Sequence, residues 1–339
     1  MDLAGQAAPG ASDRVVGRLG ARILVIRYSP LLWAAFPEDD VQAWPACARL
    51  LPHALVATEH ATILEAEWAL AADLLNKAAG YLWRRAELEQ ARQLAERSLT
   101  ILEAQLGPDH LDVALHLYNL GIVLSDLGEL PAARTACERA LQIRQAQLGP
   151  DHLDVATSLN SLGIILWRLG ELPAARTACD RALEIRQAQL GPHHLDVART
   201  LDNLGIVLLA LGELPAARTA FQRALTISEA ELGPDHPDVA STLDNLGVLL
   251  RSLGELPAAG DAHQRALAIR QAQLGPDHPE VTRSLDNIGT VLHDLGELPA
   301  AHAARQRALT IREAQLGPNH PDVAASLNVS TTSGPSSLS

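Results

Sequence analysis

The sequence predicts an all-α fold, a right-handed α-solenoid (superhelix) of stacked antiparallel helix pairs, and three observations carry that prediction. Gly-Pro pairs begin at six glycines that stand 42 residues apart: Gly107, Gly149, Gly191, Gly233, Gly275 and Gly317. The pentapeptide Leu-Gly-Glu-Leu-Pro recurs with the same period. Apolar residues between these marks follow helical spacing. A fixed period of about 20–50 residues is typical of solenoids and repeat arrays.

One repeat, residues 107–148, shows the expected local structure. Apolar residues three and four positions apart between 113 and 127 form one face of a first helix. Gly128 follows and is suited to the left-handed conformation that ends many helices. A second helix starts at Pro131, where a missing N–H costs nothing, and ends at Gly149.

Small residues inside the repeat predict that its two helices pack closely. Gly121 lies in the middle of the first helix and recurs in all five repeats, although such a glycine costs about 1 kcal/mol relative to alanine. We expect a side chain there to block the second helix, on which Ala133 and Ala140 are small for the same reason. Cys137 and Cys179 share one position on that helix and are expected to be buried thiols. A single pair cannot bury both of its faces, so the pairs must stack.

Histidines also recur every 42 residues, at His110, His152, His194, His236, His278 and His320. A row of one histidine per layer does not bring several ligands to one metal ion. We therefore expect a capping or turn role, with Asp151 or His152 capping the helix that follows. No metal and no cofactor are expected.

Composition and motifs exclude several classes of function. The net charge is −13, which argues against binding to nucleic acids or anionic membranes. The single lysine, Lys77, is not preceded by the glycine pattern of a P-loop, and no catalytic motif is found, so no enzyme is expected. Three cysteines and no apolar run of membrane-spanning length indicate a cytoplasmic protein.

The arrangement resembles the tetratricopeptide repeat. That family carries small or large residues at characteristic positions. In the first full repeat, these positions hold Leu117, Leu120, Gly121, Leu124, Ala133, Cys137 and Ala140. The period and the phrase RALEIRQAQLGPHHLDVARTLDNLG are similar to the variant found in kinesin light chains and in many bacterial signalling proteins. The resemblance implies a non-enzymatic scaffold that binds a peptide or protein segment in a concave groove lined by the first helix of each repeat.

The chain divides into six expected segments: 1–37, irregular or disordered; 38–65, helical; 66–106, a degenerate repeat; 107–316, five full repeats; 317–328, a partial repeat helix; and 329–339, a polar tail. Residues 38–61 resemble the junction that precedes the repeats in bacterial NB-ARC signalling ATPases. An alternative function follows from that resemblance, namely a separated or truncated C-terminal sensor arm of such an ATPase. We also expect self-association through the C-terminal end, where half a repeat covers the last full one.

Differences between repeats locate the candidate binding surface. Repeats 107–148 and 149–190 are identical at 33 of 42 positions, and seven of the nine differences lie on the first helix, most of them opposite its apolar face. We call the varied positions the A-helix stripe. Its candidate partner-binding residues are Tyr118, Asn119, Trp167, Arg199, Asp202, Asn203, Asp244, Asn245, Arg251, Arg283, Asp286, Asn287 and His293. An extended peptide with a hydrophobic segment and a basic segment would suit this surface.

Each part of the stripe also has a purely structural interpretation. The asparagines could bond the neighbouring helix instead of a peptide backbone. Asp202 and Asp286 could form helix-surface ion pairs with the arginines three residues earlier, Arg199 and Arg283. Trp167 could pack against an adjacent helix instead of facing the groove. The sequence leaves these alternatives open.

Overall fold

The computed structural model describes residues 44–63, 67–316 and 323, and the chain divides into two compact units, the first ending at Gly170 and the second beginning at Glu171. The first unit holds α2 (Trp44–Ile63), α3 (Trp68–Arg84), α4 (Leu88–Leu106), α5 (Leu111–Asp126), α6 (Leu130–Leu148) and α7 (Leu153–Arg168). The second unit holds α8 (Leu172–Leu190), α9 (Leu195–Ala210), α10 (Leu214–Leu232), α11 (Pro237–Ser252), α12 (Leu256–Leu274), α13 (Pro279–Asp294) and α14 (Leu298–Leu316). The described residues contain no strand.

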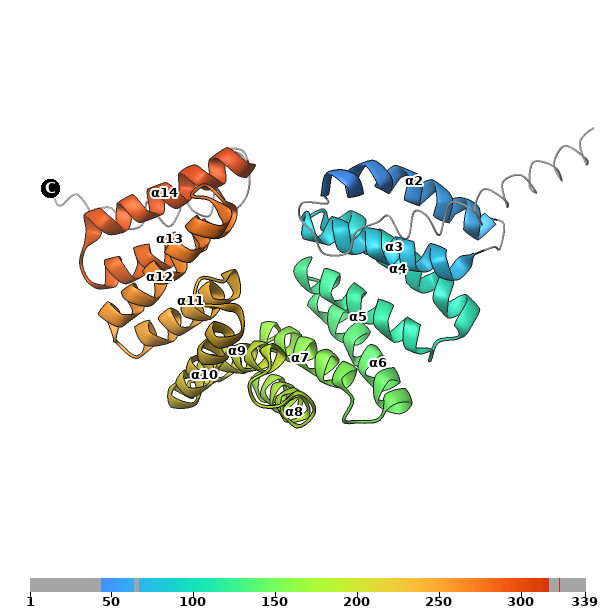
Figure 1. Ribbon diagram of the computed structural model, residues 1–339, viewed down its shortest axis with the longest axis horizontal. Helices are drawn as coiled ribbons and strands as arrows, with labels where there is room; N and C mark the ends of the chain where they lie inside the picture. The colour runs from blue at the N-terminus through green and yellow to red at the C-terminus, as the bar shows by residue number, and fades with distance from the viewer. Residues whose placement is uncertain (1–43, 64–66, 317–322, 324–339) are drawn as a thin grey trace, which may run out of the picture. The chain divides into compact units, whose positions relative to one another are not determined.

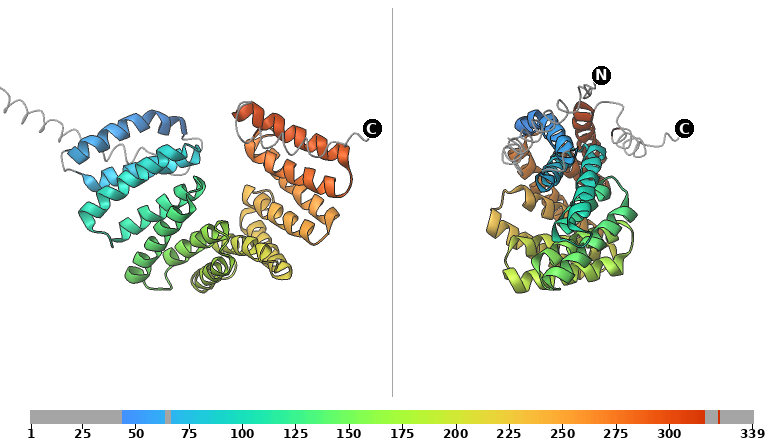
Figure 2. Two further views of the ribbon diagram at one scale, coloured as in Figure 1. Left: turned by 180° about the vertical axis from the view of Figure 1, so that it is seen from behind. Right: turned by 90° about the vertical axis from the view of Figure 1, so that its right-hand side faces the viewer.

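Within each unit, every helix packs on the next one along the chain, as Figures 1 and 2 show from several sides. We call α3, α5, α7, α9, α11 and α13 the A helices and the even-numbered helices from α4 to α14 the B helices. Successive A helices also contact one another, α3 with α5 and α5 with α7 in the first unit, and α9 with α11 and α11 with α13 in the second. Among the described helices, no two successive B helices approach each other as closely, although ion pairs such as that of Arg139 with Glu103 join them. Each unit is thus an all-α solenoid in which the A helices are the more closely spaced row.

The glycines end the helices as the sequence predicts. Gly128 has φ +82°, its N–H bonds to the Ser125 carbonyl at 3.0 Å, and the N–H of Glu129 bonds to the Leu124 carbonyl at 2.9 Å. These two bonds are the Schellman motif, which satisfies carbonyls that a helix end leaves open. Gly149 ends α6 with φ +88° and ψ +160°, a conformation that favours glycine because it has no Cβ.

Histidine caps the A helices. Nδ1 of His110 accepts a hydrogen bond from the N–H of Asp112 at 3.2 Å, and His152 binds Asp154 in the same way at 3.1 Å. The bond recurs at the start of α9, α11 and α13. The capping interpretation of the repeated histidines is therefore confirmed for these five, and His152 rather than Asp151 is the cap. His320 lies outside the described residues.

The mid-helix glycines are explained by the B helix beside them. A Cβ built on Gly121 would lie 2.4 Å from Sγ of Cys137, and one on Gly205 would lie 2.5 Å from the ring of Phe221. Cys137 and Cys179 are fully buried free thiols, as predicted, and burial raises the pKa of each to about 12.

The ends of the chain fall mostly outside the described residues. Of the segment expected at 38–65, residues 44–63 form α2, which packs on α3. The degenerate repeat at 66–106 contains the pair α3 and α4. The segments expected at 1–37 and 329–339 are not described, and of 317–328 only Val323 is, with a buried side chain.

Candidate interaction surface on the A helices

In the first unit, the A-helix stripe is partly open to solvent. Leu115 is 43% exposed, and Tyr118, Asn119 and Trp167 are half-buried. The guanidinium of Arg144 stacks on the Tyr118 ring at 5.0 Å, so the aromatic ring already has a cationic neighbour from α6. These residues combine apolar and hydrogen-bonding surface on α5 and α7.

A contact between residues 43 positions apart ties the A helices together. Asn119 Nδ2 donates to Asn76 Oδ1 at 3.2 Å, and Ser161 Oγ donates to the Tyr118 hydroxyl at 3.2 Å. In the second unit, Asn245 Nδ2 lies 3.5 Å from Asp202 Oδ1. The structural interpretation of the asparagine row therefore holds for Asn119 and Asn245. An asparagine amide keeps further donor and acceptor sites, so these bonds do not exhaust it.

The ion pairs of the second unit differ from those the sequence indicates. Arg199 is 63% exposed and pairs with Asp196 at 3.5 Å and with Asp238 at 3.6 Å, rather than with Asp202. Asp286 pairs with Arg312 of α14, not with Arg283. The pairs Arg199–Asp202 and Arg283–Asp286 are not formed, because Arg199 pairs instead with Asp196 of its own helix and Asp238 of the next one, and Asp286 pairs with Arg312 of the B helix.

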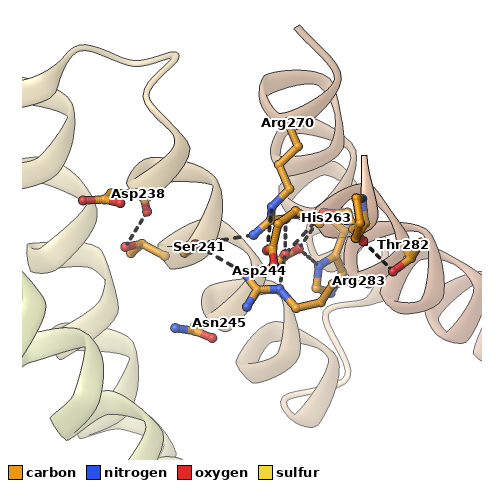
Figure 3. Close-up of polar contacts among 12 residues, drawn as sticks. Asp238, Ser241, Asp244, Asn245, His263, Arg270, Thr282 and Arg283 are labelled. Carbon is orange, nitrogen blue, oxygen red and sulfur yellow. Dashed lines mark hydrogen bonds and ion pairs between the residues drawn. The ribbon is translucent and has the colours of Figure 1, made fainter. Parts of the chain in front are cut away.

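Asp244 requires a further correction, because the stripe prediction places it on the open surface and the structure buries it (2% exposed). It accepts hydrogen bonds from Arg270 and from Nδ1 of His263 at 2.9 Å, and Arg283 Nε lies 3.4 Å away. Figure 3 shows Asp244 between these three cationic or titratable side chains. Ser284 Oγ completes the cluster at 3.3 Å.

The environment of Asp244 stabilises its ionised form. Burial alone raises the pKa of the carboxyl, but the hydrogen bond from His263 and the charge of Arg270 outweigh burial and hold the pKa below its usual range. Neither His263 nor Arg270 was singled out in the sequence. A departure from the repeat pattern could have revealed His263, because the equivalent position is Cys137 in the first full repeat.

The exposed end of the stripe in the second unit is charged. Arg251 Nε lies 2.5 Å from Asp294 Oδ2, and this guanidinium holds the pKa of Asp294 below its usual range. The side chain of His293 is 46% exposed, and its Nδ1 lies 3.7 Å from the same carboxylate. Asn203, Asn245 and Asn287 are half-buried.

The first unit also contains an open cleft that the sequence did not reveal. Its volume is about 290 Å³, and it is lined by Asn76, Lys77, Ala79, Gly80, Trp83, Arg84, Ala95, Asn119, Ile122 and Val123. A Cβ on Gly80 would meet no atom within 4 Å, so the glycine leaves this space open. The only sequence signal is a cluster of Trp, Asn, Lys and Arg in the degenerate repeat.

A serine, a histidine and an aspartate also meet in the first unit without forming a nucleophile. Ser98 Oγ lies 2.6 Å from His116 Nδ1, and His116 Nε2 lies 3.6 Å from Asp73 Oδ1. However, Ser98 is completely buried, and its hydroxyl donates to the Ala72 carbonyl at 2.7 Å. The serine proton is therefore not directed at the imidazole, as general-base activation requires. These residues join α3, α4 and α5.

Two findings concern metals and membranes. Among residues 44–63, 67–316 and 323, no three His, Cys, Asp or Glu side chains are arranged to hold a metal ion. None of the described helices combines the length and apolarity that crossing a bilayer requires.

The repeat geometry agrees with a comparison against known families. The family model of the tetratricopeptide repeat matches residues 70–136, 114–178, 161–230, 203–272 and 238–314. The matches overlap and together cover more than half of the chain. The chain belongs to the tetratricopeptide repeat family. Tetratricopeptide repeats generally serve as protein–protein interaction scaffolds, and nothing in the match indicates an enzyme.

Several solved structures resemble this one. BtubC (BKLC) from P. vanneervenii is 26% identical, with a TM-score of 0.55 over 69% of this chain and 94% of that one. A kinesin light chain-like protein from Podosopora anserina with nearly identical repeats is 17% identical, with a TM-score of 0.52 over 61% and 98%. The apo form of RapI is 15% identical, with a TM-score of 0.51 over 71% and 97%. A comparison with curated proteins gives no match.

Proposed function

We propose that this tetratricopeptide repeat protein is a non-enzymatic scaffold that binds an extended segment of a partner protein along the A-helix stripe. The observation that carries the proposal is the contrast between a constant scaffold and a varied stripe. Residues that hold the repeats together, such as Val113 and Val155, are identical and fully buried. The positions that differ gather on the A helices, where most of them reach solvent.

The chemistry of the stripe favours a peptide with an apolar part and a basic part. In the first unit, Leu115, Tyr118 and Trp167 offer apolar and aromatic surface, and Asn119 of the stripe lines the 290 Å³ cleft. In the second unit, Asp202 and Asp286 add carboxylates. Tryptophan and arginine are enriched among residues that dominate binding energy, so Trp167 and Arg251 are the best single tests.

A peptide array drawn from proteins of the native proteome, followed by fluorescence anisotropy with the selected peptide, tests the proposal. We expect Trp167→Ala and Arg251→Glu each to weaken binding about tenfold or more, the range of interface hot spots. Arg181→Glu, on an exposed face of the B helix α8, is the matched control and should leave affinity unchanged. Binding that survives both stripe variants in a folded protein contradicts the proposal.

The cleft offers a second, independent test of the same surface. Gly80→Trp is expected to fill the cleft, because a Cβ at this position meets no atom within 4 Å. Gly80→Ala leaves the cleft open and should stabilise α3 by about 1 kcal/mol, since alanine favours a helix over glycine. We expect Gly80→Trp alone to weaken peptide binding. Equal affinities for the two variants would remove the cleft from the binding surface.

We also propose, as an alternative, that the chain is the sensor or regulatory arm of an NB-ARC-type signalling ATPase acting in the cytoplasm. The resemblance of residues 38–61 to a repeat-proximal junction motivates this alternative, and α2 continues the helical stack there by packing on α3. A P-loop ATPase encoded next to this chain, and copurifying with it, would favour the alternative. An ATPase that neither copurifies nor changes activity with this chain would contradict it.

Self-association through the C-terminal end also stays a prediction, which light scattering at several concentrations can test.

A further inference from the structure

We infer that Asp202 is the receptor for an arginine side chain of the bound partner, in the place that the chain's own arginine takes in other repeats. The inference rests on the proposed function, because it assigns one contact of the partner on the A-helix stripe. It specifies the ligand as a guanidinium group. The argument uses equivalent positions of four repeats as internal comparisons.

In three repeats, an arginine of the B helix lies against the stripe residue 26 positions earlier on the A helix. Arg144 stacks on Tyr118, and Arg270 donates to the carboxylate of Asp244. Arg312 of α14 donates to Asp286 in the same way. The fold thus supplies a cation to this stripe position from inside the chain.

The repeat that contains Asp202 breaks this rule, because the equivalent B-helix residue is Ser228. Serine carries no charge and lacks the long side chain of arginine. The effect spreads to the next A helix. Ser158 and Ser284 each accept a hydrogen bond from the B-helix arginine, whereas the equivalent Thr242 donates its hydroxyl to Asp202 at 2.7 Å.

Both groups that hydrogen-bond to the Asp202 carboxylate are neutral. Thr242 is one, and Asn245 Nδ2 at 3.5 Å is the other. Because burial disfavours the charged form more than these bonds favour it, the pKa of Asp202 is raised to about 6. The contrast with Asp244, whose pKa is lowered, follows from two replacements: Phe221 stands where His263 does in the next repeat, and Ser228 stands where Arg270 does.

The nearest arginines of the A helices are engaged elsewhere. Arg199 pairs with Asp196 and Asp238. Arg283 lies 3.4 Å from Asp244 and donates to Ser241 Oγ at 3.2 Å. Arg283 acts on Asp202 only as a distant charge, and the carboxylate of Asp238 opposes it. The stripe therefore holds a half-buried carboxylate whose counter-charge must come from outside the chain.

A guanidinium fits this place better than a metal ion does. The part of the chain that the structure describes brings no three acidic, histidine or cysteine side chains together here, whereas a metal ion needs several such ligands. Arginine offers a planar set of donors that matches a carboxylate, and it keeps its charge when partly buried. Arg144 and Arg270 show that this depth of the stack accepts a guanidinium, since they are 5% and 2% exposed.

An NMR titration of the Asp202 carboxyl in the full chain tests the inference with N-acetylarginine methylamide as the probe. We expect the probe to lower the titration midpoint of Asp202 by about one pH unit, the usual effect of an adjacent arginine. N-acetylcitrulline methylamide, which is neutral and of nearly the same shape, should not change it. Ser228→Arg should lower the midpoint without any probe and abolish the response, whereas Ser228→Gln should do neither.

The outcomes separate this inference from the proposed function. If the midpoint responds equally to both probes, or does not respond at 100 mM of the arginine probe, the arginine receptor is refuted even if peptides bind the stripe. If Ser228→Arg does not fold, Asp202→Asn is used in its place. The arginine probe should then no longer shift the NMR signals of the Asn245 side chain. A shift that persists in this variant also refutes the inference. Loss of the proposed groove would instead appear as peptide binding that is insensitive to Trp167→Ala and Arg251→Glu.

Discussion

Asp202 and Asp244 occupy the same position of adjacent repeats, and two residues of the following B helix, 19 and 26 positions later, give them opposite energetics. Arg270 compensates Asp244, so a fully buried carboxylate stays ionised. Ser228 leaves Asp202 with neutral partners, so ionisation of this half-buried carboxylate is costly. The two residues look alike in the sequence. Their difference depends on the B helix that the fold places against them.

Replacing Asp244 should destabilise the protein strongly. Asp244→Asn leaves the buried guanidinium of Arg270 facing a neutral group, and breaking such a pair costs about 3–5 kcal/mol. Glu280 is 4.0 Å from Arg270 Nε and is exposed, so it does not replace the lost charge. Urea unfolding at pH 7 measures the effect. Because the pKa of Asp244 is lowered, this stability is present above about pH 4 and is lost at lower pH. A loss below 1 kcal/mol at pH 7 would contradict the prediction.

Replacing Asp202 should have the opposite effect. The folded-state pKa of about 6 exceeds the unfolded value near 3.9, so the folded chain binds more protons between these limits. Stability therefore falls as pH rises from about 4 to 6. Asp202→Asn removes that fall and should gain up to about 3 kcal/mol at pH 7, with no difference below about pH 4. Parallel urea titrations at pH 4 and pH 7 check the change, and a variant less stable than the wild type at pH 7 would refute it.

The histidine caps should each contribute a measurable part of the stability. His236 Nδ1 accepts the N–H of Asp238 at 3.1 Å at the start of α11. His236→Ala removes the acceptor and should cost about 1 kcal/mol, whereas His236→Asn supplies another good cap and should cost less than about 0.5 kcal/mol. Thermal and urea unfolding of both variants measure this. Equal losses would mean that the imidazole acts through packing instead.

At the scale of the element, each helix pair is set by a glycine on one helix and the residue that faces it on the other. Gly121 faces Cys137, Gly205 faces Phe221, and a Cβ on Gly247 would lie 2.6 Å from the ring of His263. The facing residue changes in size and polarity while the glycine stays. The glycine thus allows the B helix to vary without moving away from the A helix.

A double-mutant cycle at Gly121 and Cys137 tests that coupling. Gly121→Ala gains about 1 kcal/mol of helix propensity but overpacks the interface, which costs about 1–3 kcal/mol. Cys137→Ala removes the Sγ atom that the new Cβ would meet at 2.4 Å. We expect the double variant to be more stable than the sum of the two single changes predicts, by at least 1 kcal/mol. Additivity within 0.5 kcal/mol would show that the two residues do not oppose each other.

The sequence predicts the helix ends and the close approach of the two helices of a repeat, but it misses which polar side chains become partners between helices. Gly128 ends a helix and His152 caps one through local backbone geometry, which a single repeat contains. The partner of Asp202 or Asp286 lies on another helix, and the periodic sequence does not say how far one layer shifts against the next. Asp244 is buried beside the B helix of its own repeat, where Arg270 donates to its carboxylate. His263, which bonds to it, stood out only as an exception to the pattern.

At the scale of the whole molecule, most side-chain hydrogen bonds between successive A helices join residues 43 apart, one more than the period. Contacts join residues 43 apart on successive A helices, as in Asn119 with Asn76 and Arg251 with Asp294. The repeat is 42 residues long, so each A helix meets its predecessor one position further along. The arginines of the B helices contact the following A helix at a different, constant spacing. Arg144 donates to Ser158 and Arg186 donates to Thr200, in each case 14 residues later.

These fixed spacings predict that one complete period can be removed. Deleting 149–190 joins Leu148 to Gly191 in the same phase as the original junction, and Arg144 then meets Thr200, a contact that Arg186 already makes. Because solenoid stability is approximately a sum over repeats and their interfaces, helicity per residue should be unchanged. The calorimetric enthalpy of unfolding should fall by about 30 kcal/mol, at roughly 0.7 kcal/mol for each residue removed. A matched deletion of 149–169, half a period, removes the A helix α7, so that the B helix α8 directly follows the B helix α6, and should prevent cooperative unfolding. If both deletions behave alike, stacking does not depend on the period, and the spacing between the A helices has no structural role.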